Sequence, residues 1–195
     1  MPVPAERARR EVHNAARLLR LARSADIPVI HVILENRLLP RGVAESQRNP
    51  FWQAVEAAGV SLTPRGRAVV AGHNRPGSPG TQIMPELGPE PGDYVINNKR
   101  RLSAFYGTDL EVILRALDVE TILLIGVNTN TCVQCTAFDA FNRDFGVVVV
   151  ADCVDSMYGE DLHVFGLENI ARAFGWVLSL DEVEQRLGVR VATAL

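Results

Sequence analysis

Cys132 stands at a point in the chain where a cysteine could act as a nucleophile. An apolar run at 123–125 is followed by Gly126 and a polar turn at 128–131, and Cys132 then opens a helical pattern that extends to Asn142. A thiol in the first turn of a helix faces unpaired backbone N–H groups and the positive end of the helix dipole, and both favour the thiolate. The same N–H groups can bind an oxyanion. The segment therefore predicts a nucleophile and an oxyanion site side by side.

Two other interpretations of this cysteine stay open at this point. A lone cysteine in an apolar setting is more often a small core residue, which is our interpretation of Cys153. Cys132 and Cys135 also form a C-x-x-C pair, which is typical of thiol redox proteins. Several strand–helix units precede the pair, which argues against the redox hypothesis, and we expect Cys135 to face the core.

Lys99 is the second residue whose side chain could take part in a reaction. It follows a predicted strand, 94–97, and stands beside Arg100 and Arg101, so by itself it resembles a solvated basic cluster. An ammonium group at the same sheet edge as a thiol would favour the thiolate. The four histidines are scattered and none forms a spaced ligand pair, so the sequence predicts no metal site. It also predicts no cofactor, because the nucleotide-binding glycine motifs are absent.

The predicted elements alternate between helix and strand, which indicates an α/β fold with a parallel sheet and right-handed crossovers. In such sheets ligands bind at the carboxyl ends of the strands, where Lys99 and Cys132 both stand. Helices are predicted at 4–25, 51–58, 108–117 (from a capping box), 132–142, 163–173 and 180–187, strands at 27–33, 94–97, 121–125, 147–151 and 176–179, and a long irregular connection at 65–91.

The composition is that of an ordinary globular domain. The chain has 195 residues, is 47% hydrophobic and carries a net charge of −3, which suits one domain. No basic field indicates nucleic acid, and no apolar run is long enough to span a membrane. We find no signal peptide and only three irregularly spaced cysteines, so we expect a cytoplasmic protein with free thiols.

Several segments resemble a known family in the right order. Residues 98–110 and 126–133 are similar to the lysine and cysteine segments of isochorismatase-like cysteine hydrolases. The stretches 77–83 and 149–152 also fit, and the stretch 169–177 resembles the ureidoacrylate amidohydrolases of that family. The resemblance implies a single domain, 1–195, with three α-β-α layers around a mostly parallel sheet of Rossmann-like topology.

The resemblance also implies a reaction and a site. The family hydrolyses C–N bonds of small amides, ureides and carbamoyl compounds through a thioester, without a cofactor or a metal, and commonly forms homodimers or homotetramers. Cys132 would be the nucleophile, Lys99 its charged partner, and the N–H groups of Asn128 and Cys132 the oxyanion hole, with a cis peptide bond before Asn128. We further expect Phe105 to line and shield the site, unless it is an ordinary core residue, and Asn128 and Thr129 to form its polar wall.

One feature of the family is missing from the sequence. The family's third catalytic residue is an aspartate that ends a first, central strand, and no aspartate precedes Asp26 here. Without that strand, two neighbouring strands would lack a partner. Three explanations remain open: the true start lies upstream, which we favour; another carboxylate substitutes; or the chain is a non-catalytic relative that acts as an oligomeric binding subunit.

Overall fold

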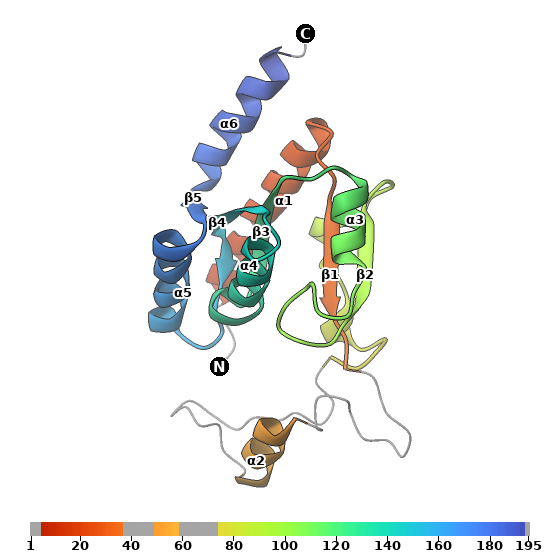
Figure 1. Ribbon diagram of the computed structural model, residues 1–195, viewed down its shortest axis with the longest axis vertical. Coiled ribbons are helices and arrows are strands. Elements are labelled where there is room, and N and C mark those ends of the chain that lie inside the picture. Colours follow the sequence, from red (N-terminus) through yellow and green to blue (C-terminus); the bar gives the residue numbers. More distant parts are fainter. Residues whose placement is uncertain (1–4, 37–48, 59–73, 194–195) are drawn as a thin grey trace.

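The computed structural model describes residues 5–36, 49–58 and 74–193, in which helices and parallel strands alternate (Figure 1). This confirms the α/β class. The helices are α1 (Ala5–Ser24), α2 (Pro50–Ala58), α3 (Leu110–Ala116), α4 (Gln134–Phe141), α5 (Glu160–Ala173) and α6 (Leu180–Thr193). The strands are β1 (Ile30–Leu34), β2 (Tyr94–Lys99), β3 (Thr121–Val127), β4 (Gly146–Asp155) and β5 (Trp176–Leu178). Short helical turns are η2 (Pro79–Thr81), η3 (Pro85–Leu87) and η4 (Thr129–Val133).

The strands form two parallel sheets instead of the single sheet that the sequence predicts. β1 pairs with β2, and β3, β4 and β5 pair in that order. Among the described residues, no hydrogen bonds join the two sheets into one ladder, so β1 and β3 each have a single strand partner.

Helix α1 holds the two sheets together. Its predicted apolar side is confirmed, with Ala15, Ala16, Leu18, Leu19 and Ala22 all buried. Leu18 packs with Val150 of β4, whereas Leu19 and Ala22 pack with Val29, just before β1. In Figure 1 the helix runs behind β3 and β4 towards β1. One helical stripe therefore contacts both sheets, and the main core, which contains Ile96 of β2 and Ile122 of β3, also joins them.

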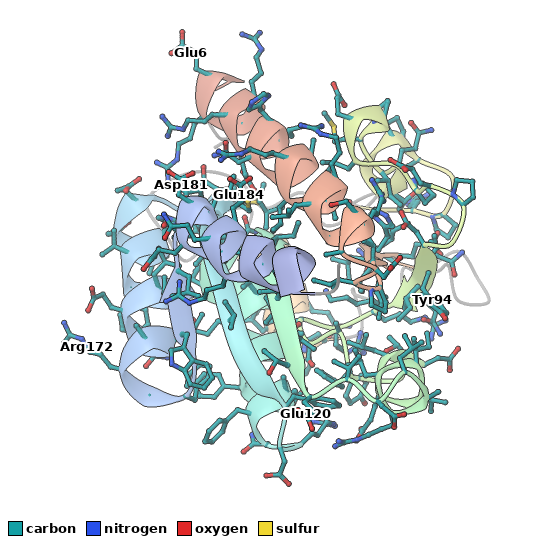
Figure 2. The ribbon with its side chains drawn as sticks, turned by 90° about the horizontal axis from the view of Figure 1, so that it is seen from above. Glu6, Tyr94, Glu120, Arg172, Asp181 and Glu184 are labelled. Carbon is teal, nitrogen blue, oxygen red and sulfur yellow. The ribbon has the colours of Figure 1, made fainter. Side chains whose placement is uncertain are left out.

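Ion pairs hold α1 at two points, near its end and in its middle. Near its end, Arg23 binds Asp93 at 2.6 Å, and His31 of β1 lies 2.9 Å from the same carboxylate. The Arg23 guanidinium is the main reason that the pKa of Asp93 lies well below its usual range. In the middle of α1, Arg17 binds Asp181 (3.1 Å) and Glu184 of α6, which lies alongside α1 in the view from above (Figure 2).

The main core lies where α3, α4 and α5 pack against the strands. Its fully buried members include Ala137, Ala140, Val149 and Ile170, which belong to three different elements. Cys153 lies in a smaller core beneath α1 and α6 and is 1% exposed. Burial raises the pKa of its thiol to about 12, which confirms the structural interpretation of this cysteine.

Several element boundaries differ from the predictions. β4 continues to Asp155, four residues beyond the predicted end, and Lys99 is the last residue of β2 instead of following it. Cys132 lies in the π-helical turn η4, and the α-helix begins only at Gln134. Residues 65–73 of the predicted irregular connection lie outside the described residues.

The predicted capping box at the start of α3 does not form. The helix begins at Leu110 after Asp109, whose side chain makes no capping hydrogen bond. The Thr108 hydroxyl accepts from the N–H of Leu110 instead, and Glu111 binds Arg143 at 2.8 Å. A tertiary ion pair therefore takes the carboxylate that the capping box would have used. Within the described residues, no helix is both long and apolar enough to cross a membrane.

The half-buried carboxyl group of Glu11 predicts a pH-dependent stability. Burial, and then the charge of Asp155, raise the pKa of Glu11 from 4.5 to about 7, although Arg7 opposes the shift. The folded state therefore binds a proton that the unfolded state has lost between these two pH values, and stability falls as pH rises through that window. We expect Glu11→Gln to raise the free energy of unfolding by about 1 kcal/mol above pH 7 and by little near pH 5, in urea titrations.

Glu120→Gln is the matched control for this substitution, because Glu120 is exposed and its side chain forms none of the described ion pairs. It should change stability by less than about 0.5 kcal/mol at either pH. A gain from Glu11→Gln that is equally large at both pH values would contradict the prediction.

Candidate active site

Lys99 and Cys132 meet across the gap between the two sheets. The ammonium Nζ of Lys99, at the end of β2, donates to the Sγ atom of Cys132 at 3.4 Å. Lys99 is only 4% exposed, whereas Cys132 is partly exposed. Lys99 lies at the carboxyl end of β2, and Cys132 lies beyond the carboxyl end of β3. Because both strands are parallel to their neighbours, residues 33 positions apart in the chain converge.

The burial of Lys99 determines what kind of partner it needs. A buried ammonium group is unfavourable unless it is paired with an anion or a strong acceptor. Among the described residues, no carboxylate forms an ion pair with Lys99, and the sulfur of Cys132 is its hydrogen-bond partner. This contact gives the buried group its acceptor. Cys135 differs, because burial, followed by the charge of Cys132, raises the pKa of its thiol.

The turn that carries Cys132 is closed by its own backbone. The peptide bond Val127–Asn128 is cis, as the family resemblance implies. The carbonyl oxygen of Asn128 accepts from the N–H groups of Thr131 (3.1 Å) and Val133 (3.2 Å), on either side of Cys132. These bonds shape the π-helical turn, a local structure that often occurs at functional sites.

A threonine connects the cysteine turn with the segment that follows Lys99. The Thr136 hydroxyl donates to the carbonyl oxygen of Cys132 at 2.7 Å and accepts from the N–H of Ala104 at 3.0 Å. Since Ala104 follows β2 and Thr136 belongs to α4, this hydroxyl joins the two halves of the site. It adds a polar link to the contact between Lys99 and Cys132.

The two residues predicted to form the polar wall contact the protein itself. The side-chain Oδ1 of Asn128 accepts from the N–H of Met157 at 2.9 Å. Thr129 is 0% exposed, and its hydroxyl lies 2.8 Å from Nδ1 of His163. The Thr129 hydroxyl thus has a protein partner, and the role of Asn128 and Thr129 in the polar wall of the site stays a prediction.

Phe105 lies in the core. It is 6% exposed, its ring stacks on Phe145 with the centroids 6.0 Å apart, and the Arg143 guanidinium lies 4.8 Å above its ring. These contacts are those of the core alternative, and the role of Phe105 in lining a pocket stays a prediction.

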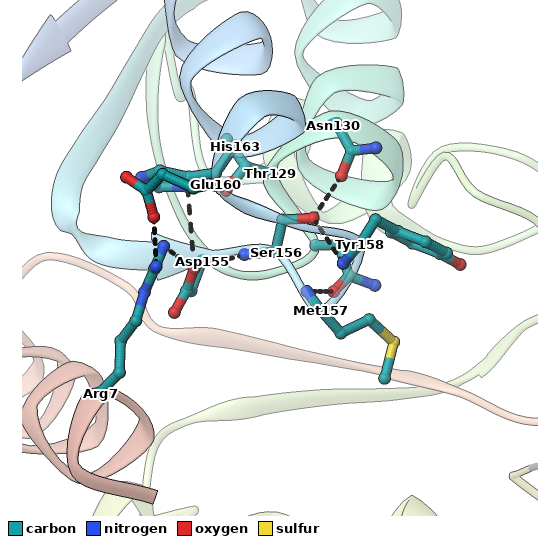
Figure 3. A network of polar contacts seen from close by, with 10 residues as sticks. Arg7, Thr129, Asn130, Asp155, Ser156, Met157, Tyr158, Glu160 and His163 are labelled. Carbon is teal, nitrogen blue, oxygen red and sulfur yellow. Dashed lines mark hydrogen bonds and ion pairs between the residues drawn. The ribbon is translucent and has the colours of Figure 1, made fainter. Parts of the chain in front are cut away.

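The segment after β4 contains site residues that the sequence interpretation missed. Burial raises the pKa of Tyr158, and the charge of Cys132 raises it further. Ser156 and His163 contact the η4 turn, and Asp155 lies next to both of them (Figure 3). The prediction ended this strand at residue 151, although the polar pair Asp155–Ser156 directly after an apolar position was a usable signal.

Two hollows lie along α1 and not around the thiol. One of about 570 Å³ is lined by α1 together with Met84 and Glu86, and one of about 360 Å³ lies between α1 and the end of β4. Cys132 and Lys99 line neither of them. The contact between the two side chains therefore locates the site.

Comparison with known proteins decides the family. The sequence model of the isochorismatase domain matches residues 3–182. The chain belongs to the isochorismatase family. The ureidoacrylate amidohydrolase RutB of Methylobacterium radiotolerans is 36% identical over 180 residues, which cover 91% of this chain and 67% of the relative. RutB of Pseudomonas syringae pv. syringae is 32% identical over 173 residues, which cover 88% and 68%.

Solved isochorismatase-like structures show the same fold. A cysteine hydrolase from Pseudomonas syringae pv. phaseolicola 1448A superposes with a TM-score of 0.76 at 25% identity and covers 94% of this chain and 83% of its own. N-carbamoylsarcosine amidase from Thermoplasma acidophilum superposes with a TM-score of 0.68 at 27% identity and covers 92% and 88%. The protein is therefore an isochorismatase-family hydrolase.

The Lys99–Cys132 contact predicts the reactivity of the thiol. Lys99→Met removes the ammonium but keeps an unbranched side chain, so Cys132 should be alkylated by iodoacetamide at least about tenfold more slowly near neutral pH. Peptide mass spectrometry measures the rate at Cys132 separately from Cys135. Arg101→Gln removes an exposed charge two residues away and should leave the rate unchanged. Equal slowing by both variants would mean that general basic charge, and not the contact, matters.

The position of Phe105 predicts a loss of stability on truncation. Phe105→Ala should lower the free energy of unfolding by about 3–5 kcal/mol, because it leaves a cavity beside Phe145. Phe165→Ala, at a residue that is 59% exposed, should change it by less than about 1 kcal/mol. Urea unfolding measures both. A stable Phe105→Ala variant with a raised KM would instead support the alternative that Phe105 lines the site.

Proposed function

We propose that this isochorismatase-family hydrolase cleaves the C–N bond of a small amide, ureide or carbamoyl compound through a thioester on Cys132. The single observation that carries the proposal is the 3.4 Å contact between a buried ammonium group and a partly exposed sulfur. The relatives support the substrate class, since two are named ureidoacrylate amidohydrolases and one structural neighbour is named an N-carbamoylsarcosine amidase.

The first half of the proposed reaction forms the thioester. The Cys132 thiolate attacks the carbonyl carbon, and the carbonyl oxygen becomes an oxyanion that accepts from the N–H groups of Asn128 and Cys132. When the tetrahedral intermediate collapses, the C–N bond breaks and the nitrogen leaves as ammonia or an amine. The leaving nitrogen needs a proton, and the Lys99 ammonium is the cation in contact with the reacting sulfur.

The second half returns the enzyme to its starting state. Lys99, now a neutral amine, accepts a proton from the water molecule that attacks the thioester carbonyl. The second tetrahedral intermediate then expels the Cys132 thiolate and releases the acid. One water molecule is consumed, and the ammonium–thiolate pair is restored.

The two thiols of the C-x-x-C pair have different surroundings. Burial, followed by the charge of Cys132, raises the pKa of the Cys135 thiol, which makes Cys135 the weaker candidate for the nucleophile. Assembly as a homodimer or homotetramer remains a prediction, which light scattering can measure.

Substitution of the two cysteines tests the proposal. With a panel of small ureides and carbamoyl compounds, Cys132→Ser should lower kcat by at least about a thousandfold, because the nucleophile is removed. Cys135→Ser should keep kcat within about threefold, since this thiol takes no part in the steps above. Equal loss in both variants, together with a stable Cys132–Cys135 disulfide at mild potentials, would favour the redox hypothesis instead.

A further inference from the structure

We propose that His163 and Ser156 are positioning residues that hold the turn 128–131 in the geometry needed for oxyanion binding. The inference rests on the proposed function, because it concerns the turn whose backbone N–H groups would bind the oxyanion. Neither residue contacts Lys99, so their effect is separate from the formation of the thiolate.

Three successive side chains of the turn are each held by the segment that follows β4 (Figure 3). The Asn128 carboxamide accepts from the N–H of Met157 at 2.9 Å. The Thr129 hydroxyl lies 2.8 Å from His163 Nδ1, and the Ser156 hydroxyl donates to Asn130 Oδ1 at 2.7 Å. Three anchors on adjacent residues leave the turn little freedom to rotate.

The anchors on Thr129 and Asn130 lie in largely buried surroundings, whereas the anchor on Asn128 is exposed. Thr129 is 0% exposed, Ser156 is 6% exposed and the His163 side chain is 12% exposed. Polar groups in such surroundings are costly to leave unpaired, so the hydrogen-bonded arrangement is strongly preferred over alternatives. Ser156 also accepts from the N–H of Tyr158 at 3.2 Å, which extends the network along the segment after β4.

Helix α5 reinforces the turn by close packing one helical turn beyond His163. A Cβ atom added at Gly166 would lie 3.2 Å from the Cα and N atoms of Asn130 and 3.2 Å from Cγ2 of Thr129. These are tight contacts, two of them with backbone atoms. Glycine at this position therefore lets the helix approach the turn closely enough for His163 to reach the Thr129 hydroxyl.

The network continues to the first helix. Asp155, which is 2% exposed, accepts from the N–H of Ser156 at 2.6 Å and lies 4.0 Å from His163 Nδ1. Arg7 of α1 binds both Asp155 and Glu160, the first residue of α5. The positioning residues are thus themselves fixed by ion pairs that join α1, β4 and α5.

The network should affect kcat without affecting the alkylation rate of Cys132, whereas a general loss of stability would lower both. The network sets the positions of the Asn128 and Cys132 N–H groups, whereas Lys99, from the other sheet, faces the sulfur. Loosening the network should therefore lower kcat, since oxyanion stabilisation acts in the transition state, and leave KM and Cys132 alkylation nearly unchanged.

The central experiment compares Thr129→Val, which removes the hydroxyl but keeps the shape, with Thr129→Ser, which keeps the hydroxyl. Hydrogen exchange of the peptide 126–136, measured by mass spectrometry, reports on the turn without a substrate. We expect faster exchange and a kcat lower by about tenfold to a hundredfold in Thr129→Val, with KM and the alkylation rate within about twofold. Thr129→Ser should retain most of the wild-type kcat and exchange.

Two matched pairs provide controls should Thr129→Val fold poorly. Ser156→Ala should loosen the same peptide, whereas Ser179→Ala, which removes a hydroxyl at the start of α6, should not. Gly166→Ala should displace the turn and lower kcat, whereas Gly188→Ala, which meets nothing within 4 Å, should leave turn exchange and kcat unchanged.

The inference is overturned if Ser156→Ala and Gly166→Ala leave the exchange of peptide 126–136 at the wild-type rate. It is also overturned if they lower kcat and Cys132 alkylation in parallel, as a merely structural role would. Failure of the proposed function would give a different result, because Cys132→Ser would then retain turnover. Hydrogen exchange of the peptide 126–136 would still show whether the network holds the turn.

Discussion

A buried ammonium group must have a partner, and the rest of the site follows from how the fold supplies one. Lys99 is nearly inaccessible to solvent, and the sulfur of Cys132 lies 3.4 Å from its Nζ atom. This pairing gives the ammonium its partner, and a cation in contact with the sulfur is what the reactivity that we propose requires. One contact therefore serves both the stability of the site and the reactivity that we propose for it.

That contact crosses from one sheet to the other. Lys99 ends a strand of the β1–β2 sheet, whereas Cys132 follows β3 in the three-stranded sheet, and no strand pairing joins the two sheets among the described residues. Helix α1 packs on both, and the Thr136 hydroxyl bridges the segments that carry the two residues. The relative position of Lys99 and Cys132 thus depends on packing and side-chain hydrogen bonds instead of a continuous ladder.

The polar network around Asp155, Ser156 and His163 is the second set of contacts that holds the cysteine turn. It reaches from Arg7 of α1 to the turn that carries Cys132, and it meets the turn at three adjacent residues. The Lys99–Cys132 contact holds the sulfur, whereas this network holds the three residues 128–130 of the turn before it. The nucleophile and the oxyanion site that we propose would therefore be held by separate sets of contacts.

The sequence by itself determined the α/β class, the family, the apolar side of α1 and the structural role of Cys153. These depend on local hydrophobic periodicity and on the order of the residues, and the sequence alone contains both. It also placed Lys99 and Cys132 at carboxyl strand ends, which was enough to predict that they share one edge. Only the tertiary structure decided that the strands split into two sheets, that Thr129 points to His163, and that Phe105 packs on Phe145. These outcomes depend on which distant side chains meet, and a pattern of spacing along the chain does not contain that information.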